Sequence, residues 1–222
     1  MKKEVKTAIY EQLARATKAM SHPKRIEIMD LLSQGEKTVD TIADQADLGV
    51  KNASAQLKEL KSALLVEFRK VGKYVFYRLA NQQASDLLLY LRKHSEQQFV
   101  ELQKIAAETF FVSDQLQSVN RKQLISRAKR GDVILLDVRP TDEYQSAHLP
   151  FARSVPISEL LQKLKTIPKT KEIVAYCRGS YCFFAKEAVE ILRKKGFKAY
   201  RLTDGVPEWE SYGLPVIRTR GA

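Results

Sequence analysis

The chain has 222 residues, 44% of them hydrophobic, which suffices for one or two domains with cores of their own. Its formal net charge of +12 favours polyanionic partners such as nucleic acid, or small anionic substrates. The sequence offers no secretory signal, no apolar run near the roughly 18 residues of a membrane span, and too few cysteines for a disulfide scaffold. We therefore expect a soluble, cytoplasmic protein that uses its two thiols for reactive or redox chemistry.

The first half is predicted to contain helices followed by one β-hairpin. Apolar residues recur at helical spacing on both sides of Pro23, and Thr38 or Asp40 is expected to cap a third helix. The predicted helices cover residues 9–20, 26–32, 38–43 and 50–62, and the predicted strands cover 64–71 and 73–79 around Gly72. This order of elements is a winged helix-turn-helix, a mainly α domain with a β-hairpin wing.

Residues 10–80 resemble the ArsR/SmtB family of dimeric bacterial repressors. The stretches that carry the resemblance are Ala19-Met20-Ser21-His22-Pro23-Lys24-Arg25-Ile26, Val39-Asp40-Thr41-Ile42-Ala43 and Val75-Phe76-Tyr77-Arg78-Leu79. The resemblance implies a repressor that binds double-stranded operator DNA.

Residues 50–62 form the expected recognition helix. Amide side chains can read adenine edges, small and basic side chains can contact bases or phosphates, and a basic wing suits phosphate or minor-groove contact. The DNA-binding candidates are Lys51, Asn52, Ser54, Ala55, Gln56 and Lys58 on the helix and Arg69, Lys70 and Lys73 on the wing. The alternative is a polar face that only meets solvent. Charge does not decide between them, because residues 1–112 carry a net of +4 and residues 113–222 a net of +8.

A long helical pattern with an apolar stripe follows over residues 82–112. In the resembled family the first and last helices pair across a two-fold axis, which implies a homodimer. The alternative is a helix that packs on the second domain of its own chain. Residues 111–117 are the predicted linker, so that the domains cover residues 1–112 and 113–222.

No metal site or cofactor is expected. Many members of the resembled family sense metals through cysteines in the third helix or through Asp, His and Glu residues in the last one. Here the third helix has no cysteine, and the last offers only Asp86, His94 and Glu96 without the paired spacing.

The second half alternates strands and helices, with strands expected over residues 133–138, 173–176 and 199–202. This alternation predicts an α/β domain with a parallel sheet and helices on both faces. Ligands of such sheets bind beyond the carboxyl ends of the strands, where Cys177 lies.

The loop from Cys177 to Cys182 holds the only two cysteines of the chain, between a buried strand and a helical pattern. Backbone N–H groups converge at such a position and the helix dipole adds positive potential, which favours thiolate over thiol at Cys177. The alternative is that both cysteines are small core residues.

Residues 117–216 resemble the rhodanese domain. The landmarks are Leu136-Asp137-Val138-Arg139, Glu143-Tyr144, Ala147-His148-Leu149-Pro150, Tyr176-Cys177-Arg178-Gly179, Leu202-Thr203-Asp204-Gly205, Trp209 and Gly213-Leu214-Pro215-Val216. Ala147, Phe151 and Asp204 stand where the family usually has glycine, so the local turns there are expected to differ.

The resemblance implies transfer of sulfane sulfur from thiosulfate, a polysulfide or a persulfide to Cys177, with the loop amides stabilising the anionic terminal sulfur. The candidate catalytic residues are Cys177, Arg178, Gly179, Ser180, Tyr181 and Cys182. Arg178 is placed to attract an anionic donor, or is simply solvated. A Cys-x5-Arg phosphatase loop is rejected, because Phe183 stands where the phosphate-binding arginine would be.

Cys182 either resolves a Cys177 persulfide into a disulfide or polysulfur bridge, or only packs. Asp137, Arg139 and His148 are interpreted as structural: the first two as a salt bridge, the third as a turn histidine.

The sequence therefore predicts a dimeric, two-domain DNA-binding regulator that senses or processes reactive sulfur through a persulfide on Cys177. The alternative is a thiosulfate or polysulfide sulfurtransferase whose helix-turn-helix half serves dimerisation or localisation. A passive rhodanese-fold module without turnover would have no need for Cys177.

Overall fold

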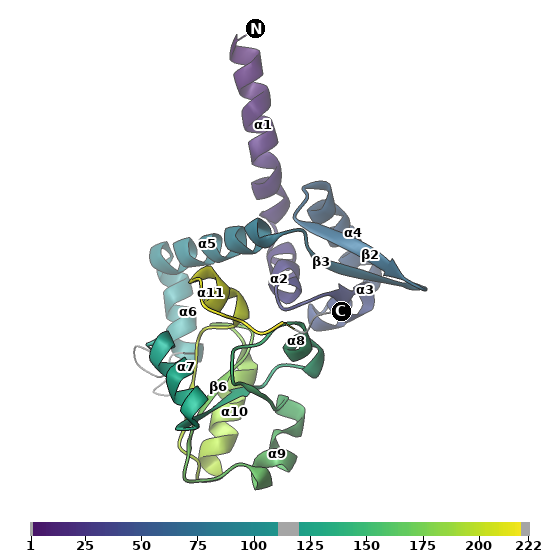
Figure 1. The fold of residues 1–222 in the computed structure, drawn as a ribbon. Helices are drawn as coiled ribbons and strands as arrows, with labels where there is room; N and C mark the ends of the chain where they lie inside the picture. The colour runs from purple at the N-terminus through teal and green to yellow at the C-terminus, as the bar shows by residue number, and fades with distance from the viewer. Residues whose placement is uncertain (1, 111–119, 219–222) are drawn as a thin grey trace. The chain divides into compact units, whose positions relative to one another are not determined.

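The computed structural model describes residues 2–110 and 120–218, and the chain divides into two compact units, Met1–Arg92 and Lys93–Ala222 (Figure 1). Helix α5 (Gln82–Gln98) runs through the division between the units. The predicted linker at residues 111–117, and with it the predicted boundary after residue 112, lies outside the described residues.

The first unit is a winged helix-turn-helix, as predicted. Its sheet is antiparallel with strand order β1-β3-β2, and Phe68 of β2 lies opposite Tyr77 of β3. Its elements before α5 are α1 (Lys2–Met20), α2 (Pro23–Leu32), β1 (Lys37–Thr38), α3 (Val39–Gln45), α4 (Val50–Ser62), β2 (Val66–Val71) and β3 (Tyr74–Leu79).

Local side chains start the two helices that follow α1. The Nδ1 atom of His22 accepts a hydrogen bond from the Lys24 amide at 3.2 Å, and Pro23 occupies the first turn, where its missing N–H is not needed. The Thr38 hydroxyl accepts from the Thr41 amide at 3.2 Å, so Thr38 rather than Asp40 caps α3.

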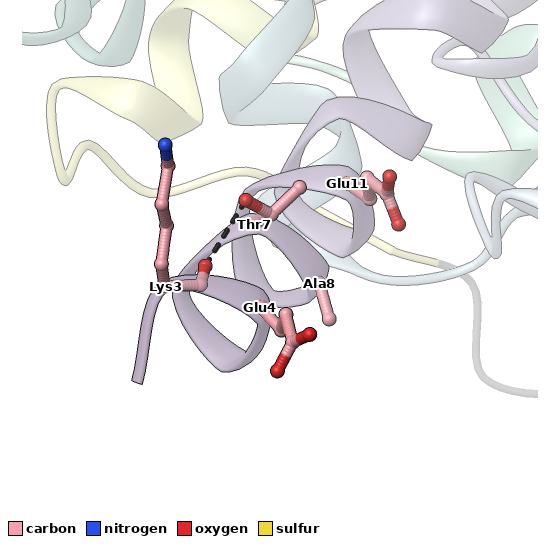
Figure 2. A pocket seen from close by; sticks show the side chains of 5 residues that line it. All are labelled: Lys3, Glu4, Thr7, Ala8 and Glu11. Carbon is pink, nitrogen blue, oxygen red and sulfur yellow. Dashed lines mark hydrogen bonds between the residues drawn. The ribbon is translucent and has the colours of Figure 1, made fainter. Parts of the chain in front are cut away.

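Helix α1 is exposed along most of its length, and only Ala19 and Met20 at its end are buried. Val5, Ile9 and Leu13, spaced four residues apart, are 55% to 65% exposed and form an apolar stripe on one side of the helix. Figure 2 shows the side chains that line a hollow beside the first turns, namely Lys3, Glu4, Thr7, Ala8 and Glu11. All five lining residues belong to this one exposed helix, so the hollow has no opposing wall in its lining.

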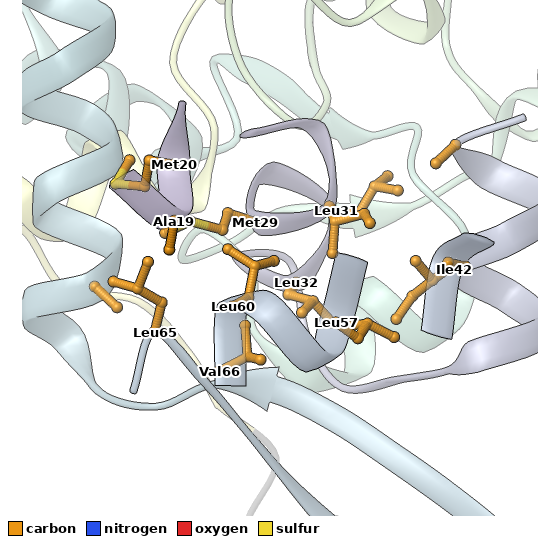
Figure 3. Packing of buried hydrophobic residues seen from close by; sticks show 14 of the residues in the cluster. Ala19, Met20, Met29, Leu31, Leu32, Ile42, Leu57, Leu60, Leu65 and Val66 are labelled. Carbon is orange, nitrogen blue, oxygen red and sulfur yellow. The ribbon is translucent and has the colours of Figure 1, made fainter. Parts of the chain in front are cut away.

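The core of the first unit lies where α2, α3 and α4 meet (Figure 3). Ile28, Met29, Ile42, Leu57 and Leu60 are all fully buried there. Burying a side chain of this size contributes about 1.5–3 kcal/mol. Because α4 turns its apolar residues inward at this point, its polar residues face outward.

The second unit is an α/β domain with a parallel sheet, as predicted. The strand order is β5-β4-β6-β7, and Leu136 of β4 lies opposite Ala175 of β6. Its longer elements after α5 are α6 (Val100–Phe110), α7 (Arg121–Arg130), β4 (Val133–Asp137), α8 (Thr141–Ser146), β5 (Arg153–Ser154), β6 (Glu172–Tyr176), α10 (Phe183–Lys194), β7 (Ala199–Arg201) and α11 (Val206–Ser211). The short turns η1 (Ile157–Glu159), α9 (Leu160–Lys163) and η2 (Leu164–Thr166) lie between β5 and β6.

Two apolar clusters cover the two faces of this sheet. One packs the buried side of α10, including Ala188 and Leu192, against Ile173 and Ala175. The other gathers residues around the fully buried Trp209 of α11 and also includes Leu124 of α7. Strand β6 therefore lies in the interior, with its carboxyl end fixed from both sides.

Candidate functional site

The loop 177–182 joins the carboxyl end of β6 to the first turn of α10. Residues 173–177 are buried, and Cys177 is 1% exposed, so the loop is held by the strand that leads into it. Cys182 is the N-cap residue of α10 and makes no side-chain capping bond to a backbone amide of that helix. Both thiols thus lie where a parallel sheet and a helix N-terminus present backbone N–H groups.

The two thiols interact with each other. The Cys177 Sγ atom lies 3.5 Å from the carbonyl oxygen of Cys182, to which the thiol can donate, and the two side chains also share a hydrogen bond. Burial, followed by that hydrogen bond, raises the pKa of Cys177 well above its ordinary value. The same hydrogen bond lowers the pKa of Cys182 to about 7 although burial opposes it, and the backbone N–H groups of Arg178 and Phe184 also lower it.

This proton distribution differs from the sequence-based expectation, which favoured a thiolate at Cys177. In the structure Cys182 is the first of the pair to ionise, because Cys177 is more deeply buried and donates its proton toward Cys182. Two coupled thiols titrate as a pair, so the first ionisation, near pH 7, belongs to the pair of sulfurs.

Arg178 is held by a buried carboxylate. Its Nε donates to both carboxylate oxygens of Glu143 at 3.0 Å, its Nη2 donates to Oε1 at 2.6 Å, and Glu143 is 1% exposed. The charge of Arg178 is therefore matched in the resting loop. Gly205 also approaches this part of the loop, because a Cβ atom there would lie 2.8–2.9 Å from backbone atoms of Cys177 and Arg178.

The outer side of the loop is covered by α6 and by the end of α5. The Phe110 ring centroid lies 4.7 Å from that of Phe183 and 5.9 Å from that of Tyr181. The Tyr181 hydroxyl donates to Glu96 Oε1 at 2.7 Å. Sequence reasoning missed Phe110 and Glu96 because they lie some seventy residues or more before the loop and carry no local motif.

A third missed residue is Arg201, at the carboxyl end of β7. It is 2% exposed, and its Nη2 donates to the carbonyl oxygen of Ser180 at 3.1 Å. The sequence offered one signal for a buried arginine. Arg201 stands two residues after Ala199 in a short strand, so both side chains lie on the same, inward face.

The DNA-binding candidates lie on the outward face of α4 and on the wing. The side chains of Lys51, Asn52, Ser54, Ala55, Lys58, Arg69, Lys70 and Lys73 are exposed, and Gln56 is half-buried. Gln56 accepts a hydrogen bond from Arg25 at 3.2 Å and donates to Asn52 at 2.9 Å, so the two amides are aligned along α4. Arg69 forms an ion pair with Glu36 at 2.6 Å.

Comparison with known proteins assigns the chain to a family. Residues 120–212 match the model of the rhodanese-like domain, and residues 20–68 match that of a helix-turn-helix domain. HTH-type transcriptional regulator Rv0324 of Mycobacterium tuberculosis is 39% identical over 211 residues, which span 95% of this chain and 92% of that protein. The chain belongs to this family of ArsR-type regulators with a rhodanese domain.

Two partial relatives match the two halves of this regulator. The protein named Sulfurtransferase of Allochromatium vinosum is 29% identical over 95 residues, 42% of this chain and 87% of that protein. A homodimeric winged helix-turn-helix DNA-binding domain from Mycobacterium bovis shares 35% identity, covers 43% of this chain and 89% of that chain, and has a TM-score of 0.41.

Three conspicuous polar residues of the rhodanese domain are structural, as predicted. Arg139 donates to Asp137 at 2.6 Å and to the carbonyl oxygen of Ala147 at 2.7 Å, with both charged side chains fully buried. His148 stacks on Tyr144 with ring centroids 3.8 Å apart, and its Nδ1 lies 2.9 Å from the Tyr144 carbonyl oxygen. These contacts fix the loop after β4.

Within residues 2–110 and 120–218 of the regulator, no three His, Cys, Asp or Glu side chains gather closely enough to hold a metal ion. Over the same residues, no helix is both long and apolar enough to cross a lipid bilayer.

Proposed function

We propose that this chain is a DNA-binding transcriptional repressor that responds to reactive sulfur through a persulfide on Cys177. The observation that carries the proposal is the contact of the thiol loop with Phe110 and Glu96. These residues belong to α6 and α5, and α5 begins three residues after the wing strand β3 ends. A change in the loop therefore has a direct route to the helix that follows the winged domain.

The proposed sulfur step begins from the singly ionised pair, with a thiolate at Cys182 and a thiol at Cys177. The proton of Cys177 passes to the Cys182 thiolate, and the Cys177 Sγ then attacks the outer sulfur of thiosulfate. A new S–S bond forms at Cys177 while the S–S bond of thiosulfate breaks, and sulfite leaves with the electron pair. A polysulfide reacts in the same way, with the shortened polysulfide as the leaving group.

Cys182 has a second proposed role after loading. The Cys182 Sγ attacks the Sγ atom of the Cys177 persulfide, and the proton that Cys182 received passes to the outer sulfur. The bond to the outer sulfur breaks, and hydrosulfide leaves. The product is a Cys177–Cys182 disulfide, and the step needs no external oxidant because the persulfide sulfur is itself reduced. The Cys177 persulfide and the Cys177–Cys182 disulfide each change the volume and charge of the loop beside Tyr181. The Tyr181 hydroxyl is hydrogen-bonded to Glu96.

The proposed DNA contact follows from the outward face of α4. Asn52 and Gln56 present amides that suit adenine edges in a major groove, and Lys51 and Lys58 present charges that suit phosphates. We expect a second copy of the chain to cover the apolar stripe of α1, because soluble proteins rarely leave such a stripe in water. A dimer would present two α4 helices to the two halves of an operator.

The test is DNA binding with and without a sulfur donor. The reduced wild-type protein and Cys177→Ser are titrated onto fluorescent promoter DNA, each before and after treatment with polysulfide. We expect an affinity change in the wild type that is absent in Cys177→Ser. DNA binding of the wild type that ignores polysulfide would contradict the sensor.

The second candidate function is a sulfurtransferase carried on a DNA-binding dimer. It is favoured by the similarity to the Sulfurtransferase of Allochromatium vinosum over residues of the rhodanese domain. Steady turnover of thiosulfate and cyanide to thiocyanate and sulfite, with DNA affinity indifferent to sulfur, would identify this function. A single loading event per chain followed by a change in DNA affinity would identify the sensor.

A further inference from the structure

Arg201 is a buried cation without a carboxylate partner in the described part of the chain. Its exposed fraction is 2%, and of its three guanidinium nitrogens only Nη2 has a hydrogen-bond partner, the Ser180 carbonyl oxygen at 3.1 Å. The Nε and Nη1 atoms are buried and unpaired among the described residues. Burying a cation in this state is unfavourable, so an unpaired guanidinium indicates a ligand that arrives later.

The guanidiniums of Arg139, which is fully buried, and of Arg178, which is half-buried, are matched by carboxylates. Arg139 is paired with Asp137, and Arg178 is paired with Glu143. Arg201 differs from both in its surroundings, because the groups that it faces are the thiol loop on one side and the Phe110 ring on the other. The guanidinium carbon lies 5.5 Å from the centre of that ring, a distance at which cation and ring attract each other.

The charges that Arg201 meets in this position are those of the two cysteines. Burial lowers the pKa of Arg201, whereas its interaction with Cys177 and Cys182 acts in the opposite direction. In the reduced loop the pair loses its first proton only near pH 7, so at neutral pH it carries on average a fraction of one negative charge. A persulfide is a stronger acid than a thiol, so sulfur loading brings a full negative charge to the loop.

We infer that Arg201 is the anion-binding residue of the sulfur loop, whose unpaired N–H groups hold the terminal sulfur of a persulfide on Cys177. This inference rests on the proposed function, since it requires that Cys177 accept sulfur. The Nε and Nη1 atoms of Arg201 have no partner among the described residues of the reduced loop, so they are available to the charge that loading brings. The Ser180 carbonyl keeps the guanidinium oriented toward the loop, and Phe110 closes it off from water.

The experiment measures how long the persulfide persists. The full-length wild type, Arg201→Met, Arg201→Lys and the control Arg193→Met are loaded with thiosulfate, separated from the donor, and followed by intact mass for loss of the added sulfur atom. Arg193 is a suitable control because its Nε donates to the carbonyl oxygen of Ala199, on the same strand as Arg201. Thermal unfolding of each reduced protein is recorded in parallel.

We expect Arg201→Met to lose its persulfide faster by about tenfold or more, since a hydrogen bond to a charged group is worth roughly that factor. Arg201→Lys keeps the charge but not the forked geometry, so its persulfide should persist for an intermediate time. The reduced Arg201→Met protein should be at least as stable as the wild type, because an unpaired buried cation has been removed. Arg193→Met should retain the wild-type persulfide lifetime.

An unchanged persulfide lifetime in Arg201→Met, or a lower melting temperature of its reduced form, would overturn this assignment and leave Arg201 with a structural role. Either result is compatible with a working sensor, since Cys177 still accepts sulfur. A wild-type protein that takes up no sulfur at all would overturn both the assignment and the proposed function.

Discussion

Gly205 lies against the carbonyl of Arg178, where a Cβ atom would come within 2.8 Å of the carbonyl carbon. Real Cβ atoms do not approach backbone atoms so closely, so Gly205→Ala has to displace the loop that carries both thiols. We expect a loss of about 1–3 kcal/mol in unfolding free energy, as for other overpacked sites, and a lower rate of sulfur loading. Denaturant unfolding and thiosulfate loading measure the two effects.

The matched control for this change is Gly49→Ala. No atom lies within 4 Å of a Cβ at Gly49, whose φ of −68° suits any residue. Sulfur loading should stay at the wild-type rate in this control. If Gly205→Ala also loads at that rate, close approach at Gly205 does not control the loop.

A second prediction concerns the pH dependence of thiol reactivity. In the wild type the first proton leaves the pair with a pKa of about 7, assigned to Cys182, because Cys177 donates a hydrogen bond to it. In Cys182→Ser the remaining thiol of Cys177 is buried, and burial raises its pKa. The midpoint of the loading rate against pH should therefore move upward, with slower loading at neutral pH. A midpoint that stays near 7 would show that Cys177 ionises independently.

A third prediction concerns the buried pair of Asp137 and Arg139. Arg139→Met leaves an unpaired carboxylate in the interior and should lower the unfolding free energy by about 3–5 kcal/mol. Arg127→Met breaks a half-exposed pair with Glu172 and should cost less than about 1 kcal/mol. Chemical denaturation measures both, and equal losses would contradict the structural role of Arg139.

The fold and the thiol loop could be predicted because their signals are local. The apolar run of β6 leads into Cys177, and a helical pattern follows Cys182, so neighbouring residues alone predict a strand, a loop and a helix. In the same way, periodicity and the two capping candidates Thr38 and Asp40 predict the helices of the winged domain, although only the structure shows that Thr38 is the cap.

The residues around the loop could not be predicted, since they come from distant segments. Phe110 and Arg201 meet across a ring-to-guanidinium contact although ninety residues separate them, and no spacing rule connects them. The order of ionisation also depends on tertiary structure, because burial rather than the helix N-terminus decides the pKa of Cys177.

The three positions where the rhodanese family usually has glycine differ from one another in backbone conformation and contacts. Phe151 has a φ of 64°, so an ordinary side chain accepts the left-handed conformation there, at the surface. The carboxylate of Asp204 forms an ion pair with Arg121 at 2.5 Å, a contact that glycine could not make. Ala147 is extended, with a φ of −160°, and needs no glycine.

A fourth prediction addresses the dimer. Leu13→Glu places a charge in the exposed apolar stripe of α1 and should shift the protein from dimer to monomer, with weaker operator binding. Gln12→Glu adds the same charge at a neighbouring exposed polar position and should leave the dimer intact. Light scattering after size-exclusion chromatography measures the mass, and a dimeric Leu13→Glu protein would contradict a role for this stripe.

The last prediction concerns Phe110, whose ring packs on Tyr181, Phe183 and Arg201. Phe110→Ala removes the cover of the thiol loop, so iodoacetamide should alkylate Cys182 severalfold faster than in the wild type. It also removes the contact between the loop and α6, so polysulfide should still load Cys177 while the affinity for DNA no longer responds.

Phe99→Ala is the control for that change, because Phe99 lies between α5 and α6 but is 52% exposed and packs on His94 rather than on the loop. Its alkylation rate and its sulfur response should match those of the wild type. Fast alkylation with an intact DNA response in Phe110→Ala would show that the ring only shields the thiols. The signal would then pass through the Tyr181–Glu96 hydrogen bond, which Tyr181→Phe removes while keeping the ring.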